Sequence, residues 1–366
     1  MREDGFNLKN PNLRGILPSE ALEAAFRRGW LVGPPPRPGQ VQPASLDLRL
    51  GARAYRLPFS FLPGRRRAVA DAVAAHAMHT LDLERDAVLE RGCVYLVELE
   101  ESLALPPHVG ASANPKSSTG RLDVFARVIA DHALEFDRIP NGYRGRLWAE
   151  ISPRTFSIKV RRGSPLVQLR LRAGDPAFAP GELERRHAST PLAHPASPLE
   201  AGRVAFHVDT LAEGGGPVAY RARKHAGLVD VDAPGAHDPA AFWEEIGPRP
   251  GGGLVLDPDD FYILASKERV VVPPDCAAEM VAYDTLVGEF RVHYAGFFDP
   301  GFGWPDGTRA VLEVRSHEVP FLLDDGQLVG HLDYARMAAV PGRLYGEDLG
   351  SHYARQGLTL SKHFRR

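Results

Sequence analysis

The most constraining feature of the sequence is an internal repeat. Residues 101–107 (ESLALPP) match residues 268–274 (ERVVVPP), and the apolar pattern of residues 147–151 (LWAEI), with its single glutamate, returns at residues 310–314 (AVLEV). Such self-similarity indicates a tandem duplication, and two copies are too few for a solenoid, whose repeats rely on their neighbours. We therefore expect two copies of one domain, each with its own hydrophobic core.

Length and composition fit this organisation. The 366 residues include 36 glycines and 32 prolines, which are scattered among short apolar runs and favour many short strands joined by turns. We predict a mainly β fold with a few short helices. The predicted units are a first domain over residues 1–175, a proline-rich linker over 176–202 and a second domain over 203–366.

Net charge and cysteine content exclude several classes of protein. The formal net charge of −2 gives no general affinity for polyanions, and we expect neither a nucleic-acid partner nor a membrane partner. The N-terminus lacks the apolar segment of a signal peptide and no run is long enough to span a membrane, so we expect a cytoplasmic protein. Two cysteines, with histidines that lack ligand spacing, predict no zinc site.

The segment 116–121 (KSSTGR) is the first candidate for binding a ligand. It places three hydroxyl groups, one glycine and two cations close together. Backbone N–H groups and small hydroxyls can surround phosphate oxygens, and an arginine such as Arg121 adds charge-assisted hydrogen bonds. A capped turn with a purely structural role is the alternative, since the P-loop pattern is absent.

Glu150 is the first candidate for acid–base chemistry. It lies in the apolar strand pattern beside Trp148. A buried carboxylate without a paired cation has a raised pKa, which suits a general base working near neutral pH. The alternative is a structural ion pair with an arginine such as Arg146 or Arg154. Glu313 occupies the matching position of the second copy and is open to the same two interpretations.

The two copies differ where an anion would bind. Residues 117–118 (SS) of the first copy are matched by residues 284–285 (DT) of the second, and Arg121 falls near residues 288–289 (GE). Because carboxylates repel a bound anion, we predict that the first copy keeps an anion-binding turn and that the second copy has lost it.

Together these pieces resemble the dCTP deaminase branch of the dUTPase-like superfamily, in a long, tandem-duplicated form. Beyond the turn at 116–121 and the Glu150 strand, the matching segments of the first copy are residues 42–51 (QPASLDLRLG), 128–131 (VIAD), 142–145 (GYRG) and 166–169 (LVQL). Those of the second copy are residues 298–302 (FDPGF), 312–313 (LE), 326–329 (GQLV) and 353–357 (YARQG), together with Tyr345.

The resemblance implies a distorted jelly-roll fold for each domain. It also implies a homo-oligomer, with a trimer as one arrangement, whose active sites lie between neighbouring domains. The implied reaction is the hydrolytic deamination of dCTP to dUTP and ammonia without zinc. Mg²⁺ would be bound with the triphosphate, with no direct protein ligands.

The resemblance also implies roles for individual residues. Glu150 would act as the general base, while Ser117 and Arg121 would orient the attacking water and bind phosphate. The backbone around Ala130 would help to hold the water and the base. The residues implied in substrate binding are Lys116, Ser118, Asp131, Gln168, Tyr345, Tyr353 and Gln356, of which the last three would close over the γ-phosphate. Glu313 is the candidate for a second site.

Two other functions stay open. A dUTPase or a bifunctional enzyme would release dUMP and pyrophosphate; the first copy has residues 140–142 (PNG) at the position of the dUTPase catalytic aspartate, whereas the second copy has Asp299 there. A non-catalytic nucleotide-binding regulator would bind dCTP or dTTP without turnover. The combination of Ser117, Arg121 and Glu150 argues against that regulator, because simple binding does not need a buried carboxylate beside the base.

Overall fold

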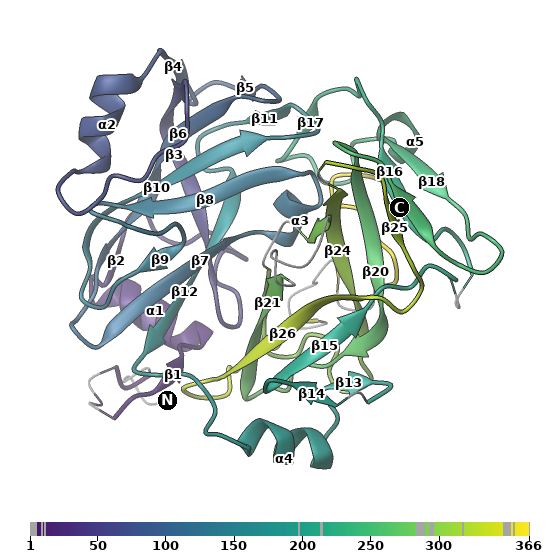
Figure 1. Ribbon diagram of the computed structural model, residues 1–366. Helices are drawn as coiled ribbons and strands as arrows, with labels where there is room; N and C mark the ends of the chain where they lie inside the picture. The colour runs from purple at the N-terminus through teal and green to yellow at the C-terminus, as the bar shows by residue number, and fades with distance from the viewer. Residues whose placement is uncertain are drawn as a thin grey trace.

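The computed structural model describes the chain except for residues 1–5, 9, 11, 197, 213–214, 283–289, 293–295, 317, 347–352, 354–355 and 366, with only the backbone at 282 and 290–292. Strands dominate, and the five helices of the described residues are short. Two β-rich halves lie side by side, the first in purple to teal and the second in green to yellow (Figure 1). The predicted mainly β fold of two tandem jelly-roll domains with a few short helices is confirmed.

The first half is built on a sheet with the strand order β8-β10-β6-β3-β12-β7-β9, to which β1, β2 and β4 add at the side. Its neighbouring strands pair in antiparallel fashion. The strands of this sheet are β1 (Gly15–Ile16), β2 (Leu31–Val32), β3 (Leu46–Leu57), β4 (His79–Asp82), β6 (Val94–Ala104), β7 (Val109–Pro115), β8 (Val124–Ala130), β9 (Arg138–Ile139), β10 (Arg144–Pro153) and β12 (Pro165–Ala173). The helices of this half are α1 (Ser19–Arg27), α2 (Val69–His76) and α3 (Ser117–Gly120).

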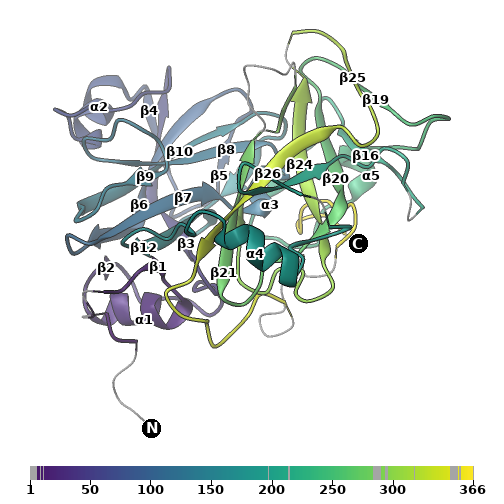
Figure 2. The ribbon, with the colours of Figure 1, turned by 60° about the horizontal axis from the view of Figure 1, so that its bottom comes forward.

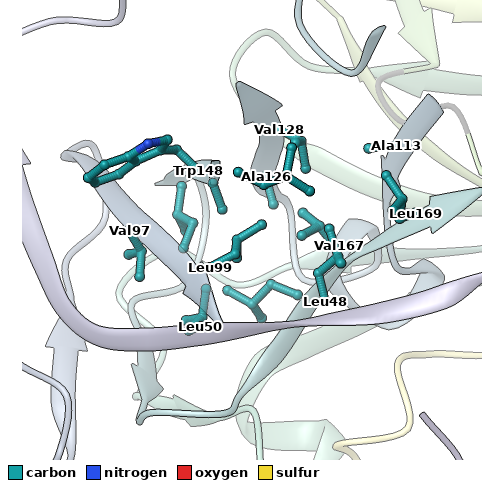
Figure 3. Packing of buried hydrophobic residues seen from close by; sticks show 14 of the residues in the cluster. Leu48, Leu50, Val97, Leu99, Ala113, Ala126, Val128, Trp148, Val167 and Leu169 are labelled. Atoms are coloured by element: carbon teal, nitrogen blue, oxygen red, sulfur yellow. The ribbon is translucent and has the colours of Figure 1, made fainter. Parts of the chain in front are cut away.

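The core of the first half is formed by the inward faces of these strands. Alternate residues of a strand point to opposite sides, so Leu46, Leu48 and Leu50 of β3 share one face, and all three are fully buried. Figure 3 shows this face, where Leu48 and Leu50 pack with side chains from the strands around them, including Val97, Leu99, Ala126, Val128, Trp148, Val167 and Leu169.

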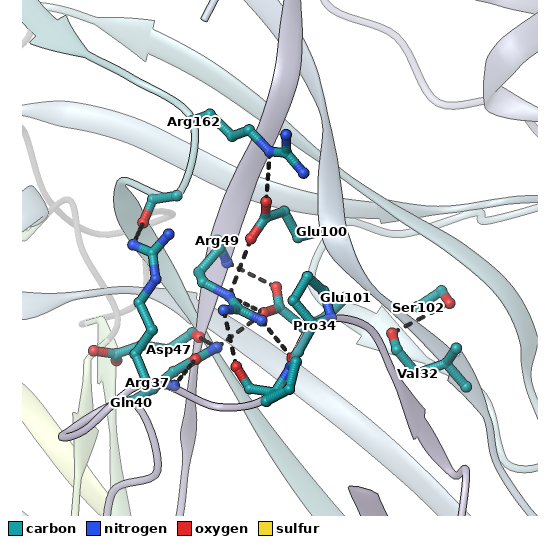
Figure 4. A network of polar contacts seen from close by, with 12 residues as sticks. Val32, Pro34, Arg37, Gln40, Asp47, Arg49, Glu100, Glu101, Ser102 and Arg162 are labelled. Carbon is teal, nitrogen blue, oxygen red and sulfur yellow. Dashed lines mark hydrogen bonds and ion pairs between the residues drawn. The ribbon is translucent and has the colours of Figure 1, made fainter. Parts of the chain in front are cut away.

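The opposite face of β3 is also buried. The sequence pattern, in which Leu46, Leu48 and Leu50 alternate with Ser45, Asp47 and Arg49, predicts a half-buried strand instead. Arg49 lies there, and its Nε donates to Glu101 Oε1 at 2.6 Å while Nη2 donates to the Pro34 carbonyl at 2.8 Å (Figure 4). Glu101 also accepts a hydrogen bond from Gln40. Arg49, Glu101 and Gln40 therefore each have a hydrogen-bond partner, which removes most of the cost of taking these groups out of water.

The second half contains two main sheets, with the strand orders β18-β16-β20-β24-β22 and β14-β15-β26-β21-β23. Its strands are β13 (Ala193–His194), β14 (Leu199–Glu200), β15 (Arg203–His207), β16 (Ala219–Ala222), β17 (Val229–Asp230), β18 (Trp243–Ile246), β19 (Leu254–Leu256), β20 (Phe261–Val270), β21 (Cys276–Ala282), β22 (Phe290–Val292), β23 (Phe297–Phe298), β24 (Thr308–Ser316), β25 (Phe321–Leu323) and β26 (Leu328–Arg336). Its helices are α4 (Glu182–Ser189) and α5 (Pro239–Phe242).

Local details repeat between the halves, as the sequence repeat predicts. The antiparallel pair of β5 (Ala87–Leu89) with β11 (Ile158–Val160) has its counterpart in the pair of β19 with β25. Glu101 accepts hydrogen bonds from the backbone and side chain of Arg49, and Glu268 bonds the backbone and ring of His207 in the same way. The repeat thus preserves buried polar contacts as well as strands.

The predicted linker is structured and packs on the second half. Within residues 176–202 lie α4, β13, which pairs with β20, and β14, which pairs with β15. Leu183, Leu192 and Ala193 are buried in the core of the second half. The exact domain boundaries stay a prediction. Within the described ranges, no helix has the length and apolar character needed to cross a membrane.

The two halves are joined by buried polar contacts and shared apolar packing. Arg170 of β12 pairs with Asp299 at 2.8 Å, and β17 adds in parallel to β11 of the first half. Trp243, Phe261 and Phe364 belong to the hydrophobic cluster that fills the first half. In both ribbon views β21, β24 and β26 run beside the first half, so the shared boundary is broad (Figures 1 and 2).

A second buried ion pair across this boundary generates a prediction about stability. Arg315 Nε lies 3.0 Å from Asp123 Oδ2, and Asp123 is fully buried. Asp123→Asn keeps a side chain that tolerates the positive φ of 56° at this position but removes the charge that balances the buried Arg315. We expect a loss of about 3 kcal/mol in the free energy of unfolding, measured by urea denaturation.

The control for this prediction is Arg146→Ala, which removes the exposed Arg146–Glu98 ion pair. Exposed pairs contribute little, so this variant should lose less than about 1 kcal/mol. Equal losses in the two variants would contradict the importance of the buried pair.

Candidate active site

A cavity of about 290 Å³ lies where the two halves meet. Its first-half wall comes from the turn after β7, from β3 and from β12; its second-half wall comes from β23, β24 and the C-terminal segment. In Figure 1, α3 lies at this boundary, beside β21 and β24. The lining residues of the first half are Gly39, Gln42, Asp47, Pro115, Lys116, Ser117, Ser118, Gly120, Arg121 and Gln168. Those of the second half are Met280, Gly296, Phe297, Phe298, Asp299, Phe302, Val311, Glu313, Tyr345, Tyr353, Gln356 and Lys362.

The KSSTGR segment forms a short helical turn, which contains α3 and directly follows the end of β7. Its backbone is held by hydrogen bonds from Lys116 N to Leu166 O at 3.0 Å and from Gly120 N to Lys116 O at 2.9 Å, while the Thr119 hydroxyl donates to Leu166 O at 2.9 Å. The turn presents Lys116, Ser117 and Ser118 to the cavity. It therefore places a cation and two hydroxyls on one wall.

Asp47 and Gln168 form the floor beside this turn. The Lys116 ammonium pairs with the Asp47 carboxylate, and Gln168 Nε2 donates to Asp47 Oδ1 at 3.0 Å. Asp47 lies on the same buried polar face of β3 as Arg49. The pairing orients Lys116 and neutralises part of its charge.

Glu313 faces this turn from β24 of the second half. It is 4% exposed, and burial raises the pKa of its carboxyl to about 8, against an opposing effect of the nearby Arg121 guanidinium. Arg121 Nε lies 4.0 Å from Glu313 Oε1, and within the described part of the chain this Nε has no hydrogen-bond partner. A carboxyl with a pKa near neutrality, beside a fixed cation in a cavity, is typical of a general base.

The C-terminal segment holds Arg121 in place. Arg121 Nη1 donates to Thr359 O and Nη2 donates to Gln356 Oε1, both at 2.9 Å, and the guanidinium lies 3.9 Å from the centre of the Tyr353 ring. Gln356 is fixed in turn, since its Nε2 donates to Arg309 O at 3.0 Å. Arg121 therefore connects the turn of the first half with the end of the chain.

Aromatic side chains and Asp299 complete the wall opposite the turn. Phe302 contacts the ring of Phe298 edge-on and lies 5.7 Å from the ring of Tyr345. Burial raises the pKa of the Tyr345 hydroxyl well above its usual range, so this group stays neutral and can donate a hydrogen bond. Asp299 accepts from Arg170 at 2.8 Å and from the Ser45 hydroxyl at 3.1 Å.

The structure brings most of the predicted site residues to this cavity. Those that line it are Lys116, Ser117, Ser118, Arg121, Gln168, Glu313, Tyr345, Tyr353 and Gln356. The matching turn of the second copy, residues 284–289, lies outside the described residues, so its predicted loss of anion binding is not addressed by the structure.

Glu150, Ala130 and Asp131 do not line this cavity, and their predicted roles stay predictions. Glu150 pairs with Arg127 of the neighbouring strand β8, and that guanidinium stacks on Phe136 at 3.7 Å. Ala130 is buried at the end of β8, and Asp131 accepts a hydrogen bond from Val69 N at 2.7 Å. The KSSTGR turn of the first half faces β24 of the second half. Glu313 of β24, and not Glu150 of β10, therefore lies beside Arg121.

Sequence reasoning missed Lys362 and the phenylalanines of the cavity. Lys362 lies near the end of the chain, in a segment without any recognised pattern, and Phe297 looks like an ordinary core residue in the sequence. Phe298 and Phe302 belong to the segment 298–302 that resembles the family, which was the signal available for them, but no role was assigned to either residue.

Comparison with known proteins agrees with this architecture. The family model described as the 2'-deoxycytidine 5'-triphosphate deaminase (DCD) N-terminal domain matches residues 13–175, and the model of the C-terminal domain of the same family matches residues 180–364. The chain therefore belongs to the 2'-deoxycytidine 5'-triphosphate deaminase family. Members of this family are enzymes that act on C–N bonds, which sets aside the non-catalytic regulator.

Individual relatives cover different shares of the chain. The crystal structure of 2'-deoxycytidine 5'-triphosphate deaminase from Agrobacterium tumefaciens is 52% identical, with a TM-score of 0.86, and the match covers 90% of this chain and 100% of that one. A protein of Methanoculleus marisnigri named "dCTP deaminase, dUMP-forming" is 30% identical over 46% of this chain and 87% of its own length. A protein of Halobacterium salinarum with the same name is 34% identical over 29% of this chain; the match spans 54% of that relative.

The raised pKa of Glu313 predicts how stability depends on pH. The folded state keeps the proton up to about pH 8, whereas the unfolded state releases it near 4.5, so the contribution of Glu313 to stability declines as the pH rises through this window. Glu313→Gln removes the titration. We expect the free energy of unfolding of this variant, relative to the unchanged protein, to increase between pH 5.5 and pH 8 in urea titrations.

A difference between the two proteins that stays constant over this pH range would contradict the raised pKa. A difference that moves in the opposite direction would show that Arg121 lowers the pKa of Glu313 by more than burial raises it.

Proposed function

We propose that this protein deaminates dCTP to dUTP and ammonia in the cavity between its halves, with Glu313 as the general base. The observation that carries the proposal is the buried Glu313 carboxyl, which has a pKa of about 8 and faces Arg121 and the Ser117–Ser118 turn. Membership of the family supplies the substrate and the reaction class.

The proposed reaction is the addition of water to C4 of the cytosine ring. The ionised Glu313 takes a proton from the water as its oxygen bonds to C4, and then passes that proton to the ring nitrogen N3. The tetrahedral centre collapses with cleavage of the C4–N bond, and the amino group leaves as ammonia after accepting the second proton of the water. Arg121 and Ser117 are fixed dipoles and charges that orient the water and stabilise this centre.

The triphosphate end would lie against the cations and hydroxyls of the cavity. Lys116, Arg121 and the hydroxyls of Ser117 and Ser118 offer donors on one side, and Tyr345 offers a neutral hydroxyl on the other. Tyr353 and Gln356 line the cavity and would also act on the substrate indirectly, because both hold the Arg121 guanidinium in place. Gln168 is predicted to bind the substrate. Its hydrogen bond to Asp47 supports a different role, in which it positions that carboxylate.

Mg²⁺ is proposed to enter with the triphosphate. Among the residues that the structure describes, no group of three or more His, Cys, Asp or Glu side chains could hold a metal ion. The cavity carboxylates Asp47 and Asp299 are already paired with Lys116 and Arg170. Phosphate oxygens would therefore hold the ion, which would offset their charge. The zinc-free chemistry and the cytoplasmic location remain predictions.

The central test compares two matched glutamates. Glu313→Gln should lower kcat for ammonia release from dCTP by roughly 100-fold or more, since general base catalysis contributes at this level. Glu150→Gln changes the counterpart in the first half, which is paired with Arg127 outside the cavity, and should keep kcat within a few-fold. Loss of activity in Glu150→Gln alone would assign the base to the first half.

The fate of dUTP is a separate prediction. Several relatives are named as dUMP-forming, and the resemblance to the dUTPase-like superfamily puts Asp299 at the position of the dUTPase catalytic aspartate. The Asp299 carboxylate is held by Arg170 at Oδ1 and by the Ser45 hydroxyl at Oδ2, contacts that tie it to the first half rather than to a water in the cavity. We therefore expect ammonia and dUTP in equal amounts, with pyrophosphate below about a tenth of the ammonia. Equal amounts of ammonia, dUMP and pyrophosphate, measured in one reaction, would establish the bifunctional enzyme.

A further inference from the structure

We propose that Lys362, near the end of the chain, binds the phosphate chain of the nucleotide and makes the C-terminal segment a specificity wall for triphosphates. The proposal rests on the proposed function, because it assumes that a deoxycytidine nucleotide occupies the cavity. Three observations support it. Lys362 lines the cavity, the residues on both sides of it are anchored in the protein, and its ammonium forms no ion pair with a carboxylate of the described residues.

The side chain of Lys362 lines the same cavity as Lys116, Arg121 and Glu313. Its backbone N–H donates to the Tyr353 hydroxyl at 2.9 Å, and the Tyr353 ring stacks on the Arg121 guanidinium. Through Tyr353, Lys362 is thereby linked to Arg121, which belongs to the anion-binding turn and lies beside the proposed base Glu313. A ligand that contacts Lys362 and Lys116 would lie along this turn.

The residues on both sides of Lys362 are anchored in the protein. Ser361 and His363 are each 2% exposed, and Ser361 Oγ lies 2.8 Å from Ser118 O and 2.9 Å from His363 Nδ1. His363 Nε2 donates to Val231 O at 2.9 Å, and Phe364 packs with Phe156 and Trp243. Burial lowers the pKa of His363 to about 4, so the ring stays neutral at physiological pH. This stretch of the C-terminal segment is therefore a fixed wall.

The charge of Lys362 has no carboxylate partner within the described residues. Lys116 is paired with Asp47, whereas Asp232, near Lys362, is occupied by Arg161 and Ser164. Burial and the proximity of Lys116 lower the pKa of the Lys362 ammonium. Asp47 and Asp232 attract the Lys362 charge without forming an ion pair with it. Two neighbouring cations, of which only Lys116 has an ion-paired carboxylate, favour a ligand that carries several negative charges, and a triphosphate provides them.

Binding measurements in the Glu313→Gln background test the proposal, because dCTP is not consumed there. Isothermal titration calorimetry would compare dCTP, deoxycytidine and inorganic tripolyphosphate as ligands of proteins that carry Lys362→Met, Lys362→Arg or no further change. Arg365→Met is the matched control, because Arg365 is an exposed cation of the same segment that does not line the cavity.

We expect Lys362→Met to raise the dissociation constants of dCTP and tripolyphosphate about tenfold or more, the loss typical of one hydrogen bond to a charged group. Deoxycytidine should bind unchanged, Lys362→Arg should recover most of the affinity, and Arg365→Met should have no effect. In the protein with Glu313 intact, Lys362→Met should raise KM for dCTP with little change in kcat.

A stability measurement separates binding from folding. Burial of the Lys362 charge is a cost in the empty protein, so Lys362→Met should have a melting temperature equal to or above that of the unchanged protein. A lower melting temperature, with equal losses for dCTP and deoxycytidine, would mean a structural role and overturn the proposal.

Two further outcomes are distinguishable. An unchanged dissociation constant for dCTP in Lys362→Met, in a protein that still deaminates dCTP when Glu313 is present, would overturn the role of Lys362 and leave the proposed function intact. Failure of the unchanged protein both to bind dCTP and to deaminate it would overturn the proposed function and this inference with it.

Discussion

The arrangement of the cavity depends on the placement of one guanidinium. Arg121 belongs to the turn after β7, yet its hydrogen bonds go to Gln356 and Thr359 at the end of the chain, and its nearest carboxylate is Glu313 of the second half. A buried cation is costly without partners, and the partners of Arg121 come from the C-terminal segment and from Glu313, so the turn, β24 and the C-terminal segment are positioned together. Any shift between the halves would break these contacts at once.

The duplication explains why the protein has two buried glutamates with different surroundings. Glu313 faces an arginine that comes from the other half and lines a cavity, whereas Glu150 is paired with Arg127 of the strand beside it. Arg121 and Glu313 come from different halves and line a cavity that has room for a ligand, whereas Arg127 and Glu150 form a pair within one sheet. The two copies have thus kept the same fold while one glutamate lines the cavity and the other pairs with a neighbouring strand. A site built within one chain does not itself require an oligomer, and the trimer stays a prediction.

Sequence reasoning succeeded where the determinants are local. The alternation in β3 and the KSSTGR turn follow from neighbouring residues, and the repeat can be recognised by comparing two stretches of the sequence directly; the structure contains each of them. Sequence reasoning named Glu150 as the general base, whereas the glutamate that lines the cavity is Glu313, because this placement depends on which half faces the turn, a contact between residues far apart in the chain. The burial of Asp47 and Arg49 was missed for the same reason, since the loops that cover them are distant in sequence. Lys362 became visible only when the folded C-terminal segment placed it in the cavity.

In the proposed arrangement, the two halves of one chain make each site. Co-expression of Arg121→Ala and Glu313→Gln chains that carry different tags tests this most directly, with ammonia release from dCTP measured on protein purified through both tags in turn or through either one. If Arg121 and Glu313 of the same chain form each site, every site in the mixture lacks one of them, and the mixture should be no more active than either variant alone. Recovery of a substantial fraction of the unchanged activity would show that the site is shared between chains and would contradict the account.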